Sequence, residues 1–228
     1  RIASISKTFT ATAIMQLRDR GLLQLDDPVS KHLMWFKFKN RFPEAPTITI
    51  RHLITHTSGL PRESPFSYWN DYNFPTREEM IECLQKQENA YPAETRFKYS
   101  NLALAIAGEV VAKVAKQPYE KYIQENIFDP LKMASSSVNL PKSHMERLAV
   151  PYDRPKADGL REILPFTDSK GITPAANLSS TVEDLGRYIS FHLSDGKAGK
   201  NTVLKSSTLR EMHRIHWLYP SWKQGGGW

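Results

Sequence analysis

The sequence has very little cysteine and no long apolar run. Its 228 residues include one cysteine, Cys83, so no disulfide can form within the chain and a cysteine-based metal cluster is excluded. No segment approaches the run of about eighteen apolar residues that a membrane-spanning helix needs. We therefore expect no membrane span in this chain, and we expect Cys83 to be an inert, buried thiol.

Patterns that bind metals or nucleic acids are also scarce. His52 and His56 could share a helix face, but the glutamate of a His-Glu-x-x-His zinc motif is missing. The formal charge of +7 is dispersed, and aromatic residues alternate with cations in one short patch only, at 34–42. We expect no metal, no cofactor and no nucleic-acid partner. A metal-dependent hydrolase using the two histidines stays a third possibility, which chelator sensitivity would distinguish.

With 40% hydrophobic residues the chain can bury a core, and its apolar periodicity predicts mainly helices. Capping boxes are expected at Thr76–Glu79 and at Ser180–Glu183. Long irregular segments are expected at 61–75 and 131–178, and loops as long as the first tend to be functional walls or lids. The expected helices lie at 9–21, 76–87, 102–114, 119–128, 181–193 and from about 206 onward.

Ser4 and Lys7 have the first spacing that suggests chemistry. Residues three apart share a helix face, so the lysine can reach the serine hydroxyl. The positive end of the helix and burial both disfavour a charged lysine, and a neutral Lys7 could activate Ser4 as a nucleophile. An ordinary helix start remains the alternative. A second copy of the pattern, Ser194–Lys197, spans an Asp-Gly turn, where the two side chains have no reason to share a face.

Tyr99-Ser100-Asn101 is the second stretch with chemical potential. A tyrosine beside a lysine can relay protons, and an asparagine amide can hold both a lysine and a substrate carbonyl. Taken alone, the triplet favours a packed Tyr99 and an Asn101 that caps the following helix. A similar triplet, Tyr68-Trp69-Asn70, occurs in the irregular segment.

Order and context decide between these alternatives. The five stretches 1–11, 25–29, 52–61, 97–101 and 175–185 together resemble the serine β-lactamase-like family, and the resemblance extends over nearly the whole chain. That family includes class C β-lactamases, D-alanyl-D-alanine carboxypeptidases, D-aminopeptidases and related esterases. The resemblance implies an α+β fold, with an antiparallel sheet flanked by helices, a mainly helical domain, and the site in the cleft between them.

The resemblance also implies roles for four residues. Ser4 would be the acylated nucleophile, Lys7 its base and Tyr99 the proton shuttle to the leaving group, while Asn101 would orient the substrate and Lys7. The Ser4 amide would supply half of an oxyanion hole, and the turn at 56–59 would be scaffold. The implied substrate is a small-molecule ester, β-lactam or D-amino-acid peptide. The alternative is a catalytically silent peptide- or partner-binding protein on the same scaffold, but a protein that only binds has no need of all four residues.

One family motif is absent. The Lys-Thr-Gly or His-x-Gly of the strand lining the site occurs nowhere, and its usual position lies beyond Trp228. We therefore expect 1–228 to be the central part of one serine β-lactamase-like domain, with a mainly helical subdomain at 61–130, and to be inactive alone. The resemblance favours the bacterial periplasm, cell envelope or secretion. Substrate identity and oligomeric state stay open.

Overall fold

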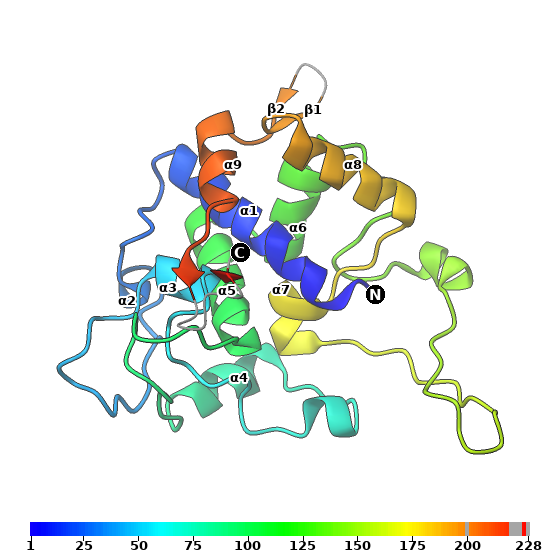
Figure 1. The fold of residues 1–228 in the computed structure, drawn as a ribbon, viewed down its shortest axis with the longest axis horizontal. Coiled ribbons are helices and arrows are strands. Elements are labelled where there is room, and N and C mark those ends of the chain that lie inside the picture. The colour runs from blue at the N-terminus through cyan, green and yellow to red at the C-terminus, as the bar shows by residue number, and fades with distance from the viewer. Residues whose placement is uncertain (199–200, 219–224, 227–228) are drawn as a thin grey trace.

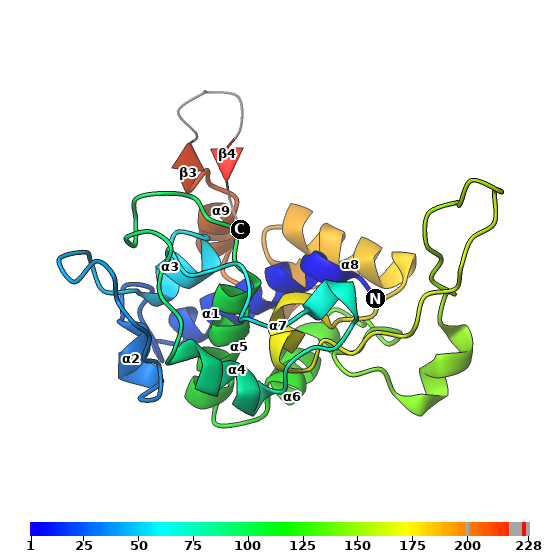
Figure 2. The same ribbon diagram turned by 90° about the horizontal axis from the view of Figure 1, so that it is seen from below.

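The computed structural model describes residues 1–198, 201–218 and 225–226. Helix α1 crosses the middle of the molecule, and the other helices surround it (Figures 1 and 2). The α-helices are α1 Ser6–Asp19, α2 Val29–His32, α3 Ile50–Ile54, α4 Arg77–Leu84, α5 Asn101–Ala115, α6 Tyr119–Ile123, α7 Thr173–Ala176, α8 Val182–Leu193 and α9 Ser206–Met212. The shorter turns are η1 Ala3–Ile5, η2 Tyr68–Asn70, η3 Gln124–Phe128 (a π-helical turn), η4 Lys142–Arg147 and η5 Lys170–Ile172.

Helix α1 is buried on all sides, although its sequence contains many polar residues. Its buried threonines are satisfied by neighbouring elements: the Thr10 hydroxyl donates to the Pro174 carbonyl at 2.7 Å, and that of Thr12 lies 3.0 Å from the Tyr188 hydroxyl. Buried polar groups that keep hydrogen-bond partners avoid most of their desolvation cost. The helix therefore lies at the centre of the fold instead of on its surface.

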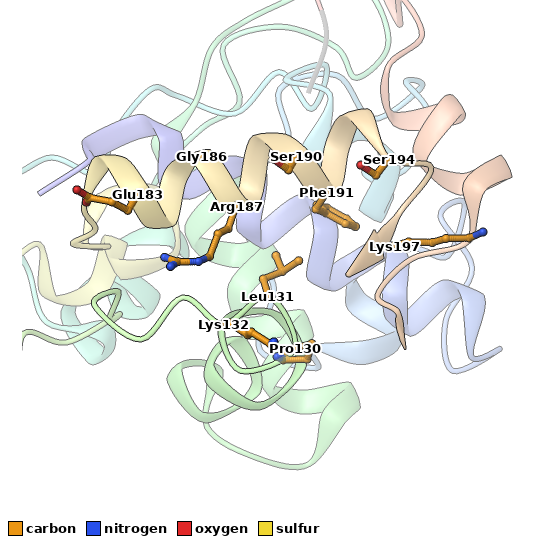
Figure 3. Close-up of a pocket in the computed structure, with 10 residues that line it drawn as sticks. All are labelled: Pro130, Leu131, Lys132, Glu183, Gly186, Arg187, Ser190, Phe191, Ser194 and Lys197. Carbon is orange, nitrogen blue, oxygen red and sulfur yellow. The ribbon is translucent and has the colours of Figure 1, made fainter. Parts of the chain in front are cut away.

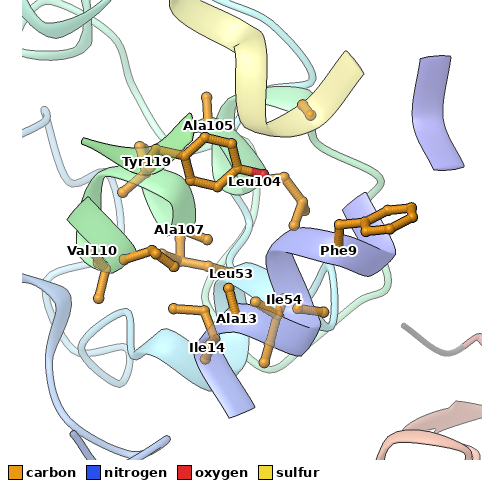
Figure 4. Packing of buried hydrophobic residues seen from close by; sticks show 14 of the residues in the cluster. Phe9, Ala13, Ile14, Leu53, Ile54, Leu104, Ala105, Ala107, Val110 and Tyr119 are labelled. Carbon is orange, nitrogen blue, oxygen red and sulfur yellow. The ribbon is translucent and has the colours of Figure 1, made fainter. Parts of the chain in front are cut away.

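The core forms where α1 meets α3 and α5. Figure 4 shows Phe9 and Ile14 of α1 in the same cluster as Leu53 of α3 and Leu104 of α5, and all four are fully buried. Helix α5 is alanine-rich, and small side chains allow close approach between helices. At Gly108 of α5 a Cβ atom would lie only 2.1 Å from the Pro174 ring of α7. This close contact holds the middle of α5 against α7.

The two capping boxes predicted from the sequence can be compared with the observed helix starts. The capping box at Thr76 is confirmed: its side chain accepts from the Glu79 amide, and Glu79 accepts from the Thr76 amide. The box expected at Ser180 is wrong by one residue, because α8 is capped by Thr181, which accepts from the Asp184 amide. Ser180 instead bonds the Ser136 hydroxyl at 2.8 Å. In the sequence, Ser180 and Thr181 are equally good candidates for the N-cap. The contact of Ser180 with Ser136 leaves Thr181 as the cap.

Strands are few in the described part of the chain. Antiparallel pairs join β1 (Lys197–Ala198) to β2 (Asn201–Thr202) and β3 (Trp217–Leu218) to β4 (Gly225–Gly226). Lys197 pairs with Thr202, and Trp217 pairs with Gly226. The structure is therefore predominantly helical here, and the larger antiparallel sheet of the expected α+β fold stays a prediction.

Only some of the apolar residues that were expected to form the buried face of α8 are buried. Tyr188 is buried against Phe9, with ring centroids 3.9 Å apart, whereas Ile189 and Leu193 are 57% and 81% exposed. Beyond this helix, the segment between η4 and η5 projects from the body as an extended loop (Figures 1 and 2). Within the described residues, no helix is both long and apolar enough to cross a membrane.

Candidate active site

A strained turn presents Ser4 at the start of α1. Ala3 has φ 44°, in the left-handed region that non-glycine residues rarely occupy. Two hydrogen bonds to Leu178 flank η1: the Ile2 amide donates to the Leu178 carbonyl at 2.8 Å, and the Leu178 amide donates to Ser6 Oγ at 3.2 Å. Leu178 therefore holds both ends of the turn, and the Ser4 side chain is exposed.

The side chains of Lys7 and Tyr99 both contact the Ser4 hydroxyl. Lys7 Nζ lies 3.0 Å from Ser4 Oγ, and the Tyr99 hydroxyl lies 2.7 Å from the same oxygen. The Lys7 amine also lies 4.9 Å from the centroid of the Tyr99 ring. Ser4 and Lys7 come from one helix start, whereas Tyr99 immediately precedes α5. The packing of α1 against α5 therefore brings the hydroxyl, the amine and the phenol together.

The environment of Lys7 favours its neutral form. The residue is only 6% exposed, and burial lowers the pKa of its amine to about 8; Glu63 acts against this change and Arg62 reinforces it. Lys7 Nζ donates to the Ala175 carbonyl at 2.8 Å, which fixes the amine in position. A neutral amine held in this way has its lone pair free to take a proton from a hydroxyl 3.0 Å away.

His56 packs against the Tyr99 ring and binds the backbone of the next residue. Its Nδ1 accepts from the Ser100 amide at 3.1 Å, and its ring lies 4.6 Å from the Tyr99 ring. Burial, and secondly the nearby Lys7 charge, lower the pKa of His56 to about 3. The imidazole is therefore neutral at physiological pH and can keep its acceptor role. Gly59 ends the same turn with φ 71°, where a Cβ atom would lie 2.0 Å from the Tyr91 carbonyl oxygen.

Asn101 lies next to this group but binds a different partner. Its Nδ2 donates to Glu63 Oε1 at 2.5 Å, and the Lys7 amine contacts Ala175 and Ser4 instead. The amide of Asn101 also donates to the Arg62 carbonyl. The N-cap of α5 is Ser100, whose Oγ accepts from the Ala103 amide at 2.9 Å. Asn101 is therefore not the cap of the helix, and its orienting role toward Lys7 stays a prediction.

Sequence reasoning did not single out Arg62 and Glu63. The Arg62 guanidinium lies 5.1 Å from the Tyr99 ring centroid, and Glu63 binds Asn101. The only available signal was their position in the irregular segment at 61–75. The contact of Lys7 with the Ala175 carbonyl could not be predicted either, because every residue has a backbone carbonyl.

The second copies of the two motifs, Ser194–Lys197 and Tyr68–Asn70, do not join the group at Ser4. The two histidines accept hydrogen bonds from backbone amides. Ser194 ends α8 and Lys197 begins β1, and Tyr68 is buried with its hydroxyl accepting from the Ser64 amide at 3.2 Å. His52 Nδ1 accepts from the Thr49 amide at 3.2 Å as part of the cap of α3. His52 and His56 therefore each use Nδ1 to hold the backbone of a different element.

Two cavities lie near parts of this region. A cavity of about 780 Å³ between α8 and residues 130–132 is lined in part by Arg187 and Lys197 (Figure 3). A smaller, more apolar cavity of about 350 Å³ has Ala3, Trp69, Val150 and Phe166 among its walls. None of the four predicted site residues lines either cavity.

Comparison with known proteins identifies the family of this chain. Residues 1–226 match the family model described as Beta-lactamase, and the chain belongs to that family. It is 37% identical over 216 residues to Beta-lactamase-like protein 2 of Dictyostelium discoideum, covering 92% of this chain and 38% of that protein.

Solved structures show the same fold. The octameric penicillin-binding protein homologue from Pyrococcus abyssi has a TM-score of 0.82 and 29% identity, covering 99% of this chain and 51% of that one. A D-stereospecific amidohydrolase from Streptomyces sp. has a TM-score of 0.80 and 26% identity, covering 100% of this chain and 68% of the other. The chain thus spans about two fifths of its curated relative and about half of the Pyrococcus chain.

Proposed function

We propose that this chain carries the acyl-transfer site of a serine hydrolase. The observation that carries the proposal is the convergence of Lys7 Nζ and the Tyr99 hydroxyl on Ser4 Oγ, at 3.0 and 2.7 Å. Neutral Lys7 takes the Ser4 proton as the oxygen attacks a carbonyl carbon. Tyr99 passes a proton to the leaving group, and water then releases the acyl group from Ser4.

The substrate is an ester, a β-lactam or a D-amino-acid peptide, and Asn101 orients it. The Ser4 amide forms one half of the oxyanion hole. The similarity to a penicillin-binding protein homologue and to a D-stereospecific amidohydrolase supports this range. We further propose that 1–228 is the central part of one domain, with 61–130 as a mainly helical subdomain and the larger sheet completing an α+β fold.

Covalent labelling tests the proposal. The full-length protein containing this chain is incubated with an alkyl fluorophosphonate or a penicillin, and its intact mass is measured. We expect a single adduct, absent from Ser4→Ala. Equal labelling of Ser4→Ala would overturn the assignment of the nucleophile, and binding of a penicillin without any adduct would favour the catalytically silent binding protein.

A further inference from the structure

The side chain of Arg1 joins three segments that are distant in the sequence. Its Nε donates to the Thr167 carbonyl at 3.0 Å, and one terminal nitrogen donates to the carbonyls of Val138 and Asn177. Its guanidinium carbon also lies 4.5 Å from the centroid of the Phe166 ring. A planar guanidinium offers several donors in a fixed fork and can stack on an aromatic ring, so this set of partners suits arginine better than lysine.

The Arg1 guanidinium is partly removed from water. The residue is half-buried, and burial lowers the pKa of its guanidinium, while the charge of Asp168 acts in the opposite direction. Burying a cation costs free energy unless its donors find acceptors, and here backbone carbonyls supply them. These carbonyls therefore hold the guanidinium, and with it the backbone of the first residues, in one position.

The end of α7 supplies carbonyls to two cations near Ser4. Asn177 is the C-cap of α7, and the last carbonyls of a helix have no partner within it. Lys7 Nζ donates to the Ala175 carbonyl at 2.8 Å, and the Arg1 side chain donates to the Asn177 carbonyl. One short helix end therefore binds a cation on each side of Ser4 in the sequence.

Asn177 is itself held firmly in place. It is 1% exposed; its Oδ1 accepts from the Ser169 amide at 3.0 Å, and its Nδ2 donates to the Val138 carbonyl at 3.2 Å. The same carbonyl accepts from Arg1. Residues 139–168, which we call the arm, include the loop that projects from the body in Figures 1 and 2. Asn177 and Arg1 therefore join the two ends of this arm.

The backbone between Arg1 and Ser4 is strained and needs support from its surroundings. Ala3 has φ 44°, and a residue in such a conformation persists only where the surrounding structure fixes it. After Ala3 the chain enters α1, which is buried on all sides. Before it, the support comes from the Arg1 side chain and from the Ile2 amide, which donates to the Leu178 carbonyl. Removing the guanidinium would therefore take away much of the support on the N-terminal side of the turn.

From this geometry we infer that Arg1 is a positioning residue for Ser4. It acts through the backbone of the turn, which keeps the Ser4 hydroxyl 3.0 Å from Lys7 Nζ and 2.7 Å from the Tyr99 hydroxyl. A displacement of about 1 Å can lower the rate of a reaction by about 10²-fold, because the reacting atoms are no longer aligned. This inference rests on the proposed acylation of Ser4 and adds a fifth residue to the four predicted ones.

The test compares Arg1→Ala and Arg1→Lys with the parent, each in the full-length protein. Labelling of Ser4 with a small alkyl fluorophosphonate is followed by intact mass, which gives both the rate constant and the fraction of molecules labelled at completion. We expect all molecules of Arg1→Ala to be labelled, but about tenfold to a hundredfold more slowly. Arg1→Lys keeps the charge without the planar fork and should stay within about threefold of Arg1→Ala.

Chemical rescue provides a readout that a merely structural role would not move. Arg1 lines the apolar cavity of about 350 Å³, so loss of its side chain leaves a space that a small cation can enter. Dilute ethylguanidinium should accelerate the labelling of Arg1→Ala several-fold, whereas ethylammonium, which has the charge but not the fork, should not.

The matched control is Arg20→Ala. The Arg20 side chain also donates to an oxygen, Asn126 Oδ1 at 2.8 Å, and lies 5.8 Å from the centroid of the Tyr122 ring, but it is exposed and outside the site. This variant should keep the parent rate constant and respond to neither cation.

A merely structural role predicts that a smaller fraction of Arg1→Ala is labelled, with the labelled molecules reacting at the parent rate, and this result overturns the inference. A parent rate constant in Arg1→Lys, or equal acceleration by the two cations, also overturns it. If Arg1→Ala does not fold, the rate constant of Arg1→Lys decides alone. Each of these results leaves the proposed nucleophile intact, whereas a parent protein that is not labelled at Ser4 overturns the proposed function together with this inference.

Discussion

Ser4–Lys7 and Ser194–Lys197 have the same spacing in sequence but different backbone conformations. From Ile5 onward the first pair follows helical geometry, with φ −59° and ψ −27° at Ile5, and Lys7 reaches Ser4. The second pair is interrupted by Asp195 and Gly196, with φ 53° and 79°, and both of its side chains are exposed. The comparison teaches that the spacing alone does not join the two side chains, because it takes a helix start to align them and burial to lower the lysine pKa.

Serine replacement should separate the two copies most strongly. Ser4→Ala removes the attacking oxygen, so turnover of a p-nitrophenyl ester by the full-length protein should fall by about 10⁴-fold or more. Ser194→Ala should stay within about twofold, the range of a neutral surface change. Comparable losses in the two variants would show that the helical copy has no special role.

Lysine replacement gives the next largest contrast. Lys7→Met keeps the length of the side chain and removes the base, and general-base catalysis contributes roughly 10²–10⁴-fold, so a loss of that size is expected in kcat/KM. Lys197→Met is the matched control at an exposed position and should be close to neutral. Activity retained by Lys7→Met would mean that another group deprotonates Ser4.

Tyr99 gives the first pair a third residue, and its coupling to Lys7 can be measured. We propose no such third residue for Ser194 and Lys197. Tyr99→Phe should reduce kcat by about 10²-fold, in the range for a positioned proton donor. Combined with Lys7→Met, it should be little worse than the more severe single variant, because both residues act on one proton path. Fully additive losses would show that the two side chains work independently.

The burial of Lys7 should be visible in stability. With the pKa lowered from 10.5 to about 8, the unfolded chain binds more protons between these values, so stability rises with pH across that window. At pH 7 the buried, charged Lys7 costs up to roughly 3 kcal/mol of unfolding free energy. Lys7→Met removes this cost, but it also loses the hydrogen bonds of the amine to Ser4 and Ala175, so the net gain is smaller. Thermal unfolding should show a gain for Lys7→Met that shrinks toward pH 10.5, and no gain for Lys197→Met.

The smallest expected effect is on the pH profile. Activity should rise with pH around 8, as Lys7 becomes neutral. Arg62→Met removes a nearby positive charge and should move the midpoint to higher pH, whereas Glu63→Gln should move it to lower pH. The displacement for Arg62→Met should be of the order of a few tenths of a unit, because Arg62 is largely exposed and its charge is screened by solvent, and that for Glu63→Gln should be the larger of the two. Displacements of the opposite sign would contradict the assignment of this titration to Lys7.

Local patterns in the sequence predicted most helices and the pair at the start of α1. The i, i+3 spacing is set by helix geometry, so Ser4 and Lys7 could be paired before any tertiary contact was known. The capping box at Thr76 was readable for the same reason. At Ser180 and Thr181 two hydroxyls competed, and the choice depended on a contact with Ser136, 44 residues away.

The rest of the candidate site was decided by tertiary packing. Thr10 and Thr12 of α1 are typical of a surface helix, yet they are buried because α7 and α8 supply hydrogen-bond partners for their hydroxyls. The approach of Glu63 to Asn101 depends on a loop that has no periodicity of its own. The sequence by itself therefore determined the family, from the order of its motifs, and the pairing of Ser4 with Lys7, from helix geometry. The burial that lowers the pKa of Lys7 and the acceptors beside it required the folded chain, because desolvation and charge proximity are properties of the whole packing.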